Sequence, residues 1–202
     1  MKLLLVLAAV LLAAACGSEG STATDPGSAP TASGVPAAAG LVRTRGVVTV
    51  MDTGSPELCL GAVAESWPPQ CGGPALAGWD WTEHEGMYQK SGTTRWGQFV
   101  VTGRWDGSTF SYEDAIAGAV YDPMPDPSPS YPPVSVEHTR AELQQIADEV
   151  GRDLPGAQGA YVDGHRVLVD VVYDDGSLQD QVDAQYGAGV VALTSALVDV
   201  GE

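Results

Sequence analysis

The sequence predicts an α+β protein in which a small all-β barrel or sandwich precedes an αββαβ sheet with its helices on one face. Short β-branched and aromatic runs with glycine-rich turns fill residues 41–121, as is typical of a small β-domain. A proline-rich stretch at 122–133 then predicts an extended linker. Helical periodicity first appears beyond it, so residues 134–202 are expected to form a separate α/β domain.

The start of the chain has the pattern of a secretory signal peptide. Lys2 supplies a short positive region, and an unbroken apolar run extends from Leu3 to Ala15. As a helix this run would span only about 20 Å, too short for the ~30 Å hydrocarbon core of a bilayer. We therefore expect residues 1–15 to be removed during export rather than to cross the membrane.

The end of this run, Leu12-Ala13-Ala14-Ala15-Cys16-Gly17, resembles the lipobox of bacterial lipoproteins. The resemblance implies that the Cys16 thiol receives a diacylglyceryl group and that cleavage makes this residue the mature N-terminus. Two acyl chains suffice for stable anchoring, so the predicted location is the extracytoplasmic face of the cell membrane. The rest of segment 16–40 is mostly small and polar, which predicts a disordered tether.

The sequence has three cysteines, an odd number for an exported protein. If Cys16 carries lipid, Cys59 and Cys71 remain in an oxidising compartment, and one disulfide between them is the simplest state. A redox site would typically have C-x-x-C spacing, and a zinc site would need further ligands. A disulfide here closes a short loop and stabilises the fold by ~3 kcal/mol in the chain-entropy model.

The predicted β-domain consists of several short strands. Its candidates in chain order are the β-branched run 41–51, the segments 57–63 and 76–81, and a hairpin over 95–112. In that hairpin Asp106-Gly107, between Trp105 and Ser108, has the composition of a two-residue type I′ turn. The number and spacing of these strands suit an OB-like barrel.

The C-terminal part alternates helix and strand signals. Thr139-Arg140-Ala141-Glu142 is a capping box and predicts a helix that ends at Gly151. Segment 159–173 predicts a hairpin that turns at Asp163-Gly164. Ser177 is expected to cap a second helix that ends at Gly187, and a last strand lies within 189–197. Strand, helix and strand in this order predict a parallel crossover.

Two stretches of the β-domain, CLGAVAESWPPQCGGPALAGWDW and RWGQFVVTGRWDGSTFS, carry a family resemblance. They resemble a group of uncharacterised secreted lipoproteins of actinobacteria, and the likeness covers residues 47–121. The resemblance implies location and fold. It implies no activity, no substrate and no catalytic residue.

The net charge of −17 limits the partners of this chain. Nucleic-acid binding needs clusters of lysine and arginine that neutralise phosphates, so we expect no nucleic-acid partner. The same charge opposes adsorption to anionic lipid beyond the acyl anchor. No motif for a cofactor is present, and we expect none; weak binding of divalent cations is the alternative use of the acidic surface.

Asp52-Thr53-Gly54-Ser55 matches the motif around an aspartic-protease carboxylate. That chemistry needs two aspartates that share a proton, and the chain has no second copy of the motif. We interpret the segment as a glycine turn between strands. His84, His138 and His165 lie beside charged or turn residues and are expected at the surface, with no catalytic constellation around them.

Trp67, Trp79 and Trp81 lie close to the two cysteines in sequence and could form either core or a contact surface. We expect a non-catalytic lipoprotein that binds or scaffolds at the cell envelope, with this region as the contact surface and an envelope protein or cell-wall ligand as partner. One alternative is an aspartic-type envelope hydrolase that uses Asp52. Another is an inhibitor or chaperone-like partner of a protease.

Overall fold

The fold was analysed in a computed structural model that describes residues 34–122 and 130–201. The predicted signal peptide, Cys16, the tether as far as residue 33 and linker residues 123–129 lie outside the described residues. Within them, no helix is both long enough and apolar enough to cross a membrane.

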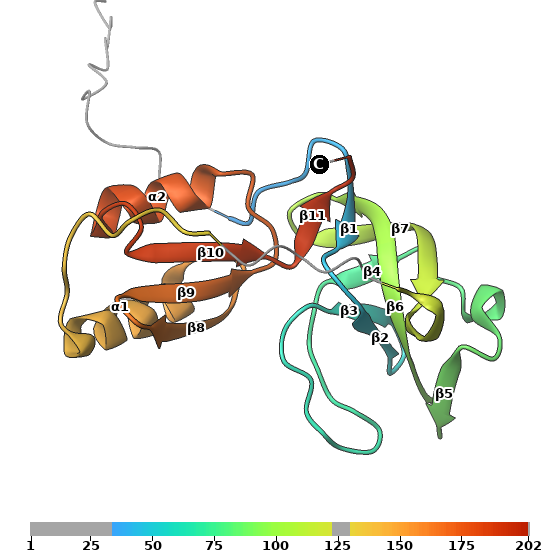
Figure 1. The fold of residues 1–202 in the computed structure, drawn as a ribbon. Helices are drawn as coiled ribbons and strands as arrows, with labels where there is room; N and C mark the ends of the chain where they lie inside the picture. The colour runs from blue at the N-terminus through green and yellow to red at the C-terminus, as the bar shows by residue number, and fades with distance from the viewer. Residues whose placement is uncertain (1–33, 123–129, 202) are drawn as a thin grey trace, which may run out of the picture.

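The described part of the chain has a mixed α+β architecture that is rich in strands and contains two α-helices (Figure 1). Five strands form a closed barrel, with neighbours in the order β2-β3-β4-β7-β6 and with β6 pairing β2 to complete the ring. Their bounds are β2 Val48–Asp52, β3 Pro56–Cys59, β4 Ala75–Ala77, β6 Thr94–Trp105 and β7 Thr109–Ala117. All neighbours are antiparallel except β4 and β7, which are parallel.

Three further strands extend the sheet beyond the five-stranded ring, and two short 3-10 helices belong to the same part of the chain. Strands β1 (Leu41–Thr44) and β5 (Tyr88–Ser91) both pair with β6, and β11 (Leu197–Asp199) pairs with β1. The 3-10 helices are η1 (Trp81–His84) and η2 (Gly118–Val120). The expected single run 41–51 is thus two strands, β1 and β2, that pair with different parts of β6. Segments 57–63 and 76–81 contain shorter strands than predicted.

Strand β6 organises this part of the molecule because it pairs with four other strands along its 12 residues. Its register with β7 shifts between Thr102 and Gly103, which marks a β-bulge. A Cβ atom at Gly103 would lie 2.1 Å from the backbone oxygen of Ser111, so only glycine fits this crossing. The barrel core contains aromatic and aliphatic side chains from nearly every strand, among them Val50, Leu58, Leu76, Phe99 and Phe110.

Both hairpins exist, but each turns one residue later than predicted. Asp106 N donates to Thr109 O, which places Gly107 and Ser108 at the turn. Asp163 pairs with Arg166, so the second hairpin turns at Gly164-His165. Gly107 and Gly164 have φ of +97° and +58°, a left-handed backbone region that residues with a side chain disfavour. Asp106 precedes the first turn, and its carboxylate accepts hydrogen bonds from Ser108 N and Thr109 N.

The second sheet has the order β10-β9-β8, with β8 (Ala157–Asp163) and β9 (Arg166–Val171) antiparallel and β9 and β10 (Val191–Ser195) parallel. Helices α1 (Arg140–Asp153) and α2 (Ser177–Tyr186) pack on it. Alternate residues of β9, Val167, Val169 and Val171, are buried in one cluster with apolar side chains of both helices.

Two predicted helix boundaries need correction. Helix α1 continues past Gly151 to Asp153 and ends where Pro155 forces extended backbone on Leu154, whose ψ is 127°. At α2, Ser177 is the first helical residue and not the cap. The Asp174 carboxylate accepts from Leu178 N and Gln179 N and thereby satisfies free amides of the first turn.

The two parts of the chain are joined more closely than the predicted domain boundaries allow. The C-terminal strand β11 belongs to the barrel sheet, and Val172 and Tyr173, which follow β9, are buried in the barrel core. Residues 34–40, expected in the tether, also pack on the barrel: Trp105 Nε1 donates to Pro36 O at 2.8 Å. The packing of these segments thus differs from the predicted boundaries at 40 and at 134–202.

Candidate binding groove

A groove of about 920 Å³ opens at one end of the barrel. The loop between β3 and β4, the start of β5, the first half of β6 and the end of β7 line it. The lining residues are Thr49, Val63–Trp67, Pro69, Gly86–Gln89, Trp96–Gln98 and Ala117–Val120. In Figure 1 this loop and β5 lie at the lower end of the barrel, whereas the segment that leads into β1 lies at the upper end.

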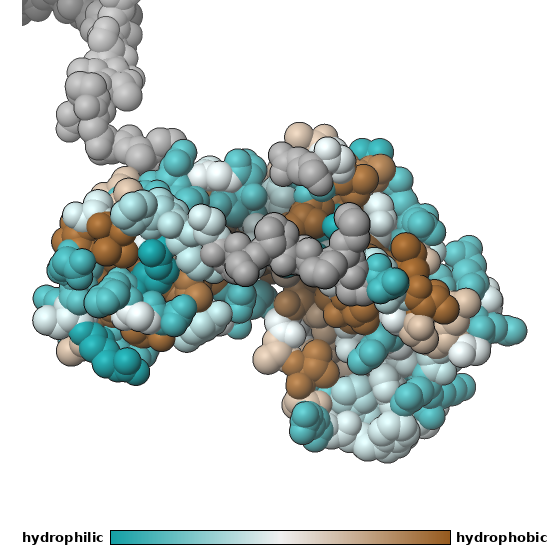
Figure 2. Space-filling view, in the orientation of Figure 1, coloured by the Kyte–Doolittle hydropathy of each residue, from teal (hydrophilic) through white to brown (hydrophobic). Residues whose placement is uncertain are grey.

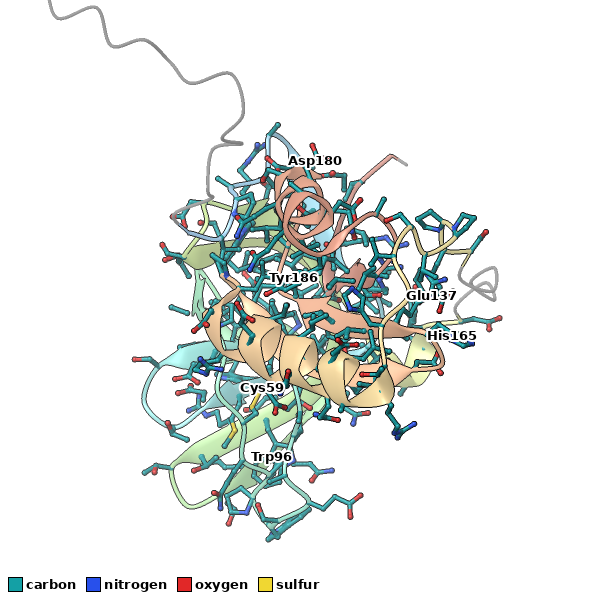
Figure 3. The ribbon with its side chains drawn as sticks, turned by 90° about the vertical axis from the view of Figure 1, so that its left-hand side faces the viewer. Cys59, Trp96, Glu137, His165, Asp180 and Tyr186 are labelled. Atoms are coloured by element: carbon teal, nitrogen blue, oxygen red, sulfur yellow. A yellow bond between two sulfur atoms is a disulfide. The ribbon has the colours of Figure 1, made fainter. Side chains whose placement is uncertain are left out.

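The Cys59–Cys71 disulfide closes the loop that forms one wall of the groove. The structure confirms this predicted bond, whose partners are 12 residues apart (Figure 3). Cys59 is buried at the end of β3, so the bond ties the loop directly to the barrel wall. Within the loop, Ala64 N donates to Gln70 O at 2.8 Å and Ser66 Oγ donates to Pro68 O. These bonds hold the tip in one shape.

Trp67 stands at the tip of this loop with 73% of its surface exposed. Its ring meets that of Trp96 on β6 at a centroid distance of 5.0 Å and an interplanar angle of 89°. Trp96 itself is only 7% exposed. An edge-to-face contact of this kind stabilises the pair by about 0.5–1.5 kcal/mol beyond area burial, so a buried residue holds an exposed indole in place.

Other apolar side chains surround the exposed indole. Val63, Met87 and Val120 line the groove and are exposed to 37%, 52% and 76%. They come from three separate segments: the disulfide loop, the entry to β5 and the 3-10 helix η2. The fold thus collects exposed apolar groups at one site rather than scattering them singly, which is a feature of binding surfaces.

The groove also contains neutral polar side chains with unused hydrogen-bonding capacity. Thr49, Gln89 and Gln98 lie among its lining residues, and their side chains make no hydrogen bond to other described parts of the chain. Among the described residues that line the groove, Glu65 is the only one with a formally charged side chain. The site therefore offers an aromatic surface and groups that both donate and accept, with almost no charge.

The other two tryptophans of the expected contact surface are not on the surface. Trp79 and Trp81 are 8% and 3% exposed and pack in the barrel core, as the core alternative predicted, so they do not contribute to a contact surface. Both follow β4, Trp79 just before η1 and Trp81 as its first residue, and both rings pack against Phe99. The groove residue that sequence reasoning missed is Trp96, whose position opposite Trp67 depends on long-range pairing of β6.

The Asp52 carboxylate has a structural role. Its Oδ1 accepts from Gly54 N at 2.8 Å, and its Oδ2 accepts from Trp81 Nε1 at 2.9 Å. The first bond stabilises the turn between β2 and β3, and the second satisfies a buried indole. Both oxygens are thus engaged as the glycine-turn interpretation requires, and Asp52 is not among the groove residues.

His84 is buried, not at the surface as expected, because η1 closes over the barrel core. Only 6% of it is exposed, and its ring stacks on Trp79 at a centroid distance of 4.1 Å and an angle of 19°. Its Nε2 has no hydrogen-bond partner among the described residues. Burial lowers the pKa of His84 below its ordinary value, and the nearby Glu83, Asp80 and Asp114 oppose that shift.

The remaining ionisable groups form no second site. His165 is exposed and lies 3.8 Å from the Glu137 carboxylate (Figure 3). Burial, with Glu149 nearby, raises the pKa of Tyr186 to about 12. Within residues 34–122 and 130–201 no three histidine, cysteine or acidic side chains are arranged to hold a metal ion.

The surface is also hollowed where the two parts of the chain meet (Figure 2). A cavity of about 440 Å³ at this junction is lined by loop 60–62, β8, β9 and the end of β10. Arg45 Nε donates to Ser195 O at 2.8 Å across it. This contact joins the two parts, and we assign the cavity a structural role.

No family model, no curated protein and no solved structure matches the chain.

Proposed function

We propose that this chain is a lipid-anchored lipoprotein at the extracytoplasmic face of the cell membrane and that it binds an envelope ligand through the groove at Trp67. The anchor rests on the sequence Leu12–Gly17, with acylation at Cys16. The ligand site rests on the geometry of the groove. The protein acts by binding, with no catalytic step.

The exposed but ordered indole of Trp67 is the observation that carries this proposal. A disulfide, two loop hydrogen bonds and an edge contact with Trp96 all hold this side chain toward solvent. A large apolar group that is fixed outward is typical of a binding residue, because it loses little conformational freedom when a ligand covers it. The apolar neighbours of Trp67 would add affinity for a ligand, and the free side-chain amides of the groove would fix the orientation of that ligand.

The barrel supports the same proposal through its topology. We propose an OB-type arrangement, since β2, β3, β4, β6 and β7 pair in the ring order 1-2-3-5-4 with a parallel third and fifth strand. OB-folds bind oligonucleotides and oligosaccharides. The net charge of −17 disfavours the former. A fold by itself does not assign a function, so the groove residues remain the main support.

The position of the tether suits a ligand that lies away from the membrane. Pro36, near the described start of the chain, is held by Trp105 at the end of β6. Trp96, Gly97 and Gln98, which line the groove, lie near the other end of the same strand. At ~3.3 Å per residue these two ends are separated by up to about 30 Å. A lipid attached upstream therefore leaves the groove end free.

The anchor is tested by the mass of the mature N-terminal peptide from cell membranes. We expect a diacylglyceryl-modified Cys16 as the first residue, and a Cys16→Ser variant that is lost from the membrane fraction. An unmodified, uncleaved N-terminus would contradict the anchor.

The groove is tested by site-specific photo-crosslinking in intact cells. A benzophenone amino acid at Val120, which is exposed and lines the same groove as Trp67, should give a recurrent adduct. The same probe at Tyr161, half-exposed on β8 and outside the groove, is the matched control. Adducts at Val120 that do not exceed those at Tyr161 would contradict a ligand in the groove, whatever its chemistry.

A further inference from the structure

We infer that the ligand of the groove is a neutral saccharide chain. This inference rests on the proposed function and names the ligand class for the same site. It depends on three properties of the lining residues: the presentation of the aromatic rings, the chemistry of the polar groups and the near absence of charge.

The aromatic surface suits a sugar ring. Trp67 meets Trp96 almost perpendicularly and remains 73% exposed, so a wide area of the indole stays open to solvent. The C–H face of a pyranose is apolar and flat enough to stack on such a ring, which has an apolar face and few rotamers. Tyr88, half-buried in the same groove, is held against Trp81 at 4.8 Å and adds a second fixed aromatic side chain.

The polar groups match hydroxyls. The side-chain amides of Gln89 and Gln98 each offer two donors and an acceptor, and the hydroxyl of Thr49 both donates and accepts. None of the three is used in a hydrogen bond elsewhere in the described chain. A sugar hydroxyl also donates and accepts, so a polyol can satisfy these groups in pairs. An apolar peptide side chain would leave them unpaired at a cost of about 1–3 kcal/mol for each buried group.

The charge of the site selects an uncharged chain. Within residues 34–122 and 130–201, no lysine, arginine or histidine lines the groove, and Glu65 is its only charged side chain. A polymer with phosphates or carboxylates would meet no cation here and would approach a protein of net charge −17. The volume of about 920 Å³ lies at the upper end of the range for small-ligand sites, ~300–1,000 Å³, which suits an oligomer better than one ring.

The test measures saccharide binding by the mature lipoprotein in neutral-detergent micelles, by calorimetry and tryptophan fluorescence. The probes are uncharged oligosaccharides of glucose, mannose, galactose and arabinose, with polygalacturonate as the anionic comparison. We expect binding of at least one neutral series and none of the polyanion. Trp67→Ala should weaken that binding at least tenfold and Gln98→Leu several-fold, whereas Tyr161→Ala should leave it unchanged.

A cooperative thermal unfolding transition in each variant shows that the fold is intact; Trp67→Ala should lower its midpoint by only a few degrees, because the variant loses the contact with Trp96. Binding of no neutral series, or binding that Trp67→Ala does not weaken, overturns the saccharide inference. The crosslinking experiment separates this failure from that of the proposed function. A protein adduct at Val120 would retain a binding role and reject the saccharide, whereas absence of any adduct would reject both.

Discussion

Removal of the disulfide should weaken both the fold and the groove. The change is the double variant Cys59→Ala/Cys71→Ala, which leaves no free thiol in this loop. Cys59 is buried in the barrel wall, and its partner lies 12 residues further along the chain. In the chain-entropy model, a loop of this length lowers the entropy of the unfolded chain by an amount equivalent to about 3 kcal/mol. The folded-to-unfolded ratio should therefore fall by about a hundredfold.

Urea unfolding followed by tryptophan fluorescence measures this loss. We expect a lower midpoint and a steeper slope, since the unfolded chain without a crosslink exposes more surface. In a domain of this size the melting temperature should fall by about 6–12 °C. Saccharide binding should weaken as well, because Trp67 is carried by the loop that the bond closes. An unchanged midpoint, with ligand binding retained, would refute the stabilising role that we assign to the bond.

Three further predictions concern single residues. Burial lowers the pKa of His84 in the fold below the ordinary 6.5, so protonation favours the unfolded chain and stability should fall as the pH drops below that value. The urea midpoint of His84→Phe should therefore depend less on pH between pH 5 and 7, and an unchanged dependence would disprove this. Gly103→Ala would place a Cβ 2.1 Å from Ser111 O and should lower the free energy of unfolding by about 1–3 kcal/mol. Gly46→Ala, whose Cβ would meet no atom within 4 Å, should leave the free energy of unfolding unchanged. Thr139→Ala removes the capping box of α1 and should lower the free energy of unfolding by about 1 kcal/mol, measured by urea titration; no loss would mean that the cap is not stabilising.

Local signals in the sequence predicted much of the architecture. The capping box at Thr139 marks the start of α1, and the Asp106-Gly107 and Asp163-Gly164 dipeptides mark the positions of the two hairpins. The displacement of the turns has a local cause that composition alone does not reveal. At Asp106 the side chain takes three bonds from Ser108 and Thr109, which puts this aspartate before the turn rather than within it.

Long-range pairing explains what the sequence did not predict. Strand β11 follows β10 after a single residue, yet it leaves the second sheet and pairs with β1 in the barrel. Trp67 and Trp96 come together only because β6 brings its first half beneath the disulfide loop. The same closure buries His84, which its charged neighbours in the sequence had placed at the surface, and places Trp79 in the core. The number of cysteines was enough to predict the disulfide, whereas the groove could be found only from the three-dimensional structure of the barrel.

Retention on the cell envelope tests the binding role most directly. The mature protein, solubilised in mild detergent, is applied to delipidated envelope from the cells that produce it, so that the acyl anchor cannot contribute. We predict that the wild type and Tyr161→Ala are retained equally and that Trp67→Ala is retained at least tenfold less. Equal retention of all three proteins, or retention of none, would contradict a ligand-binding groove at Trp67.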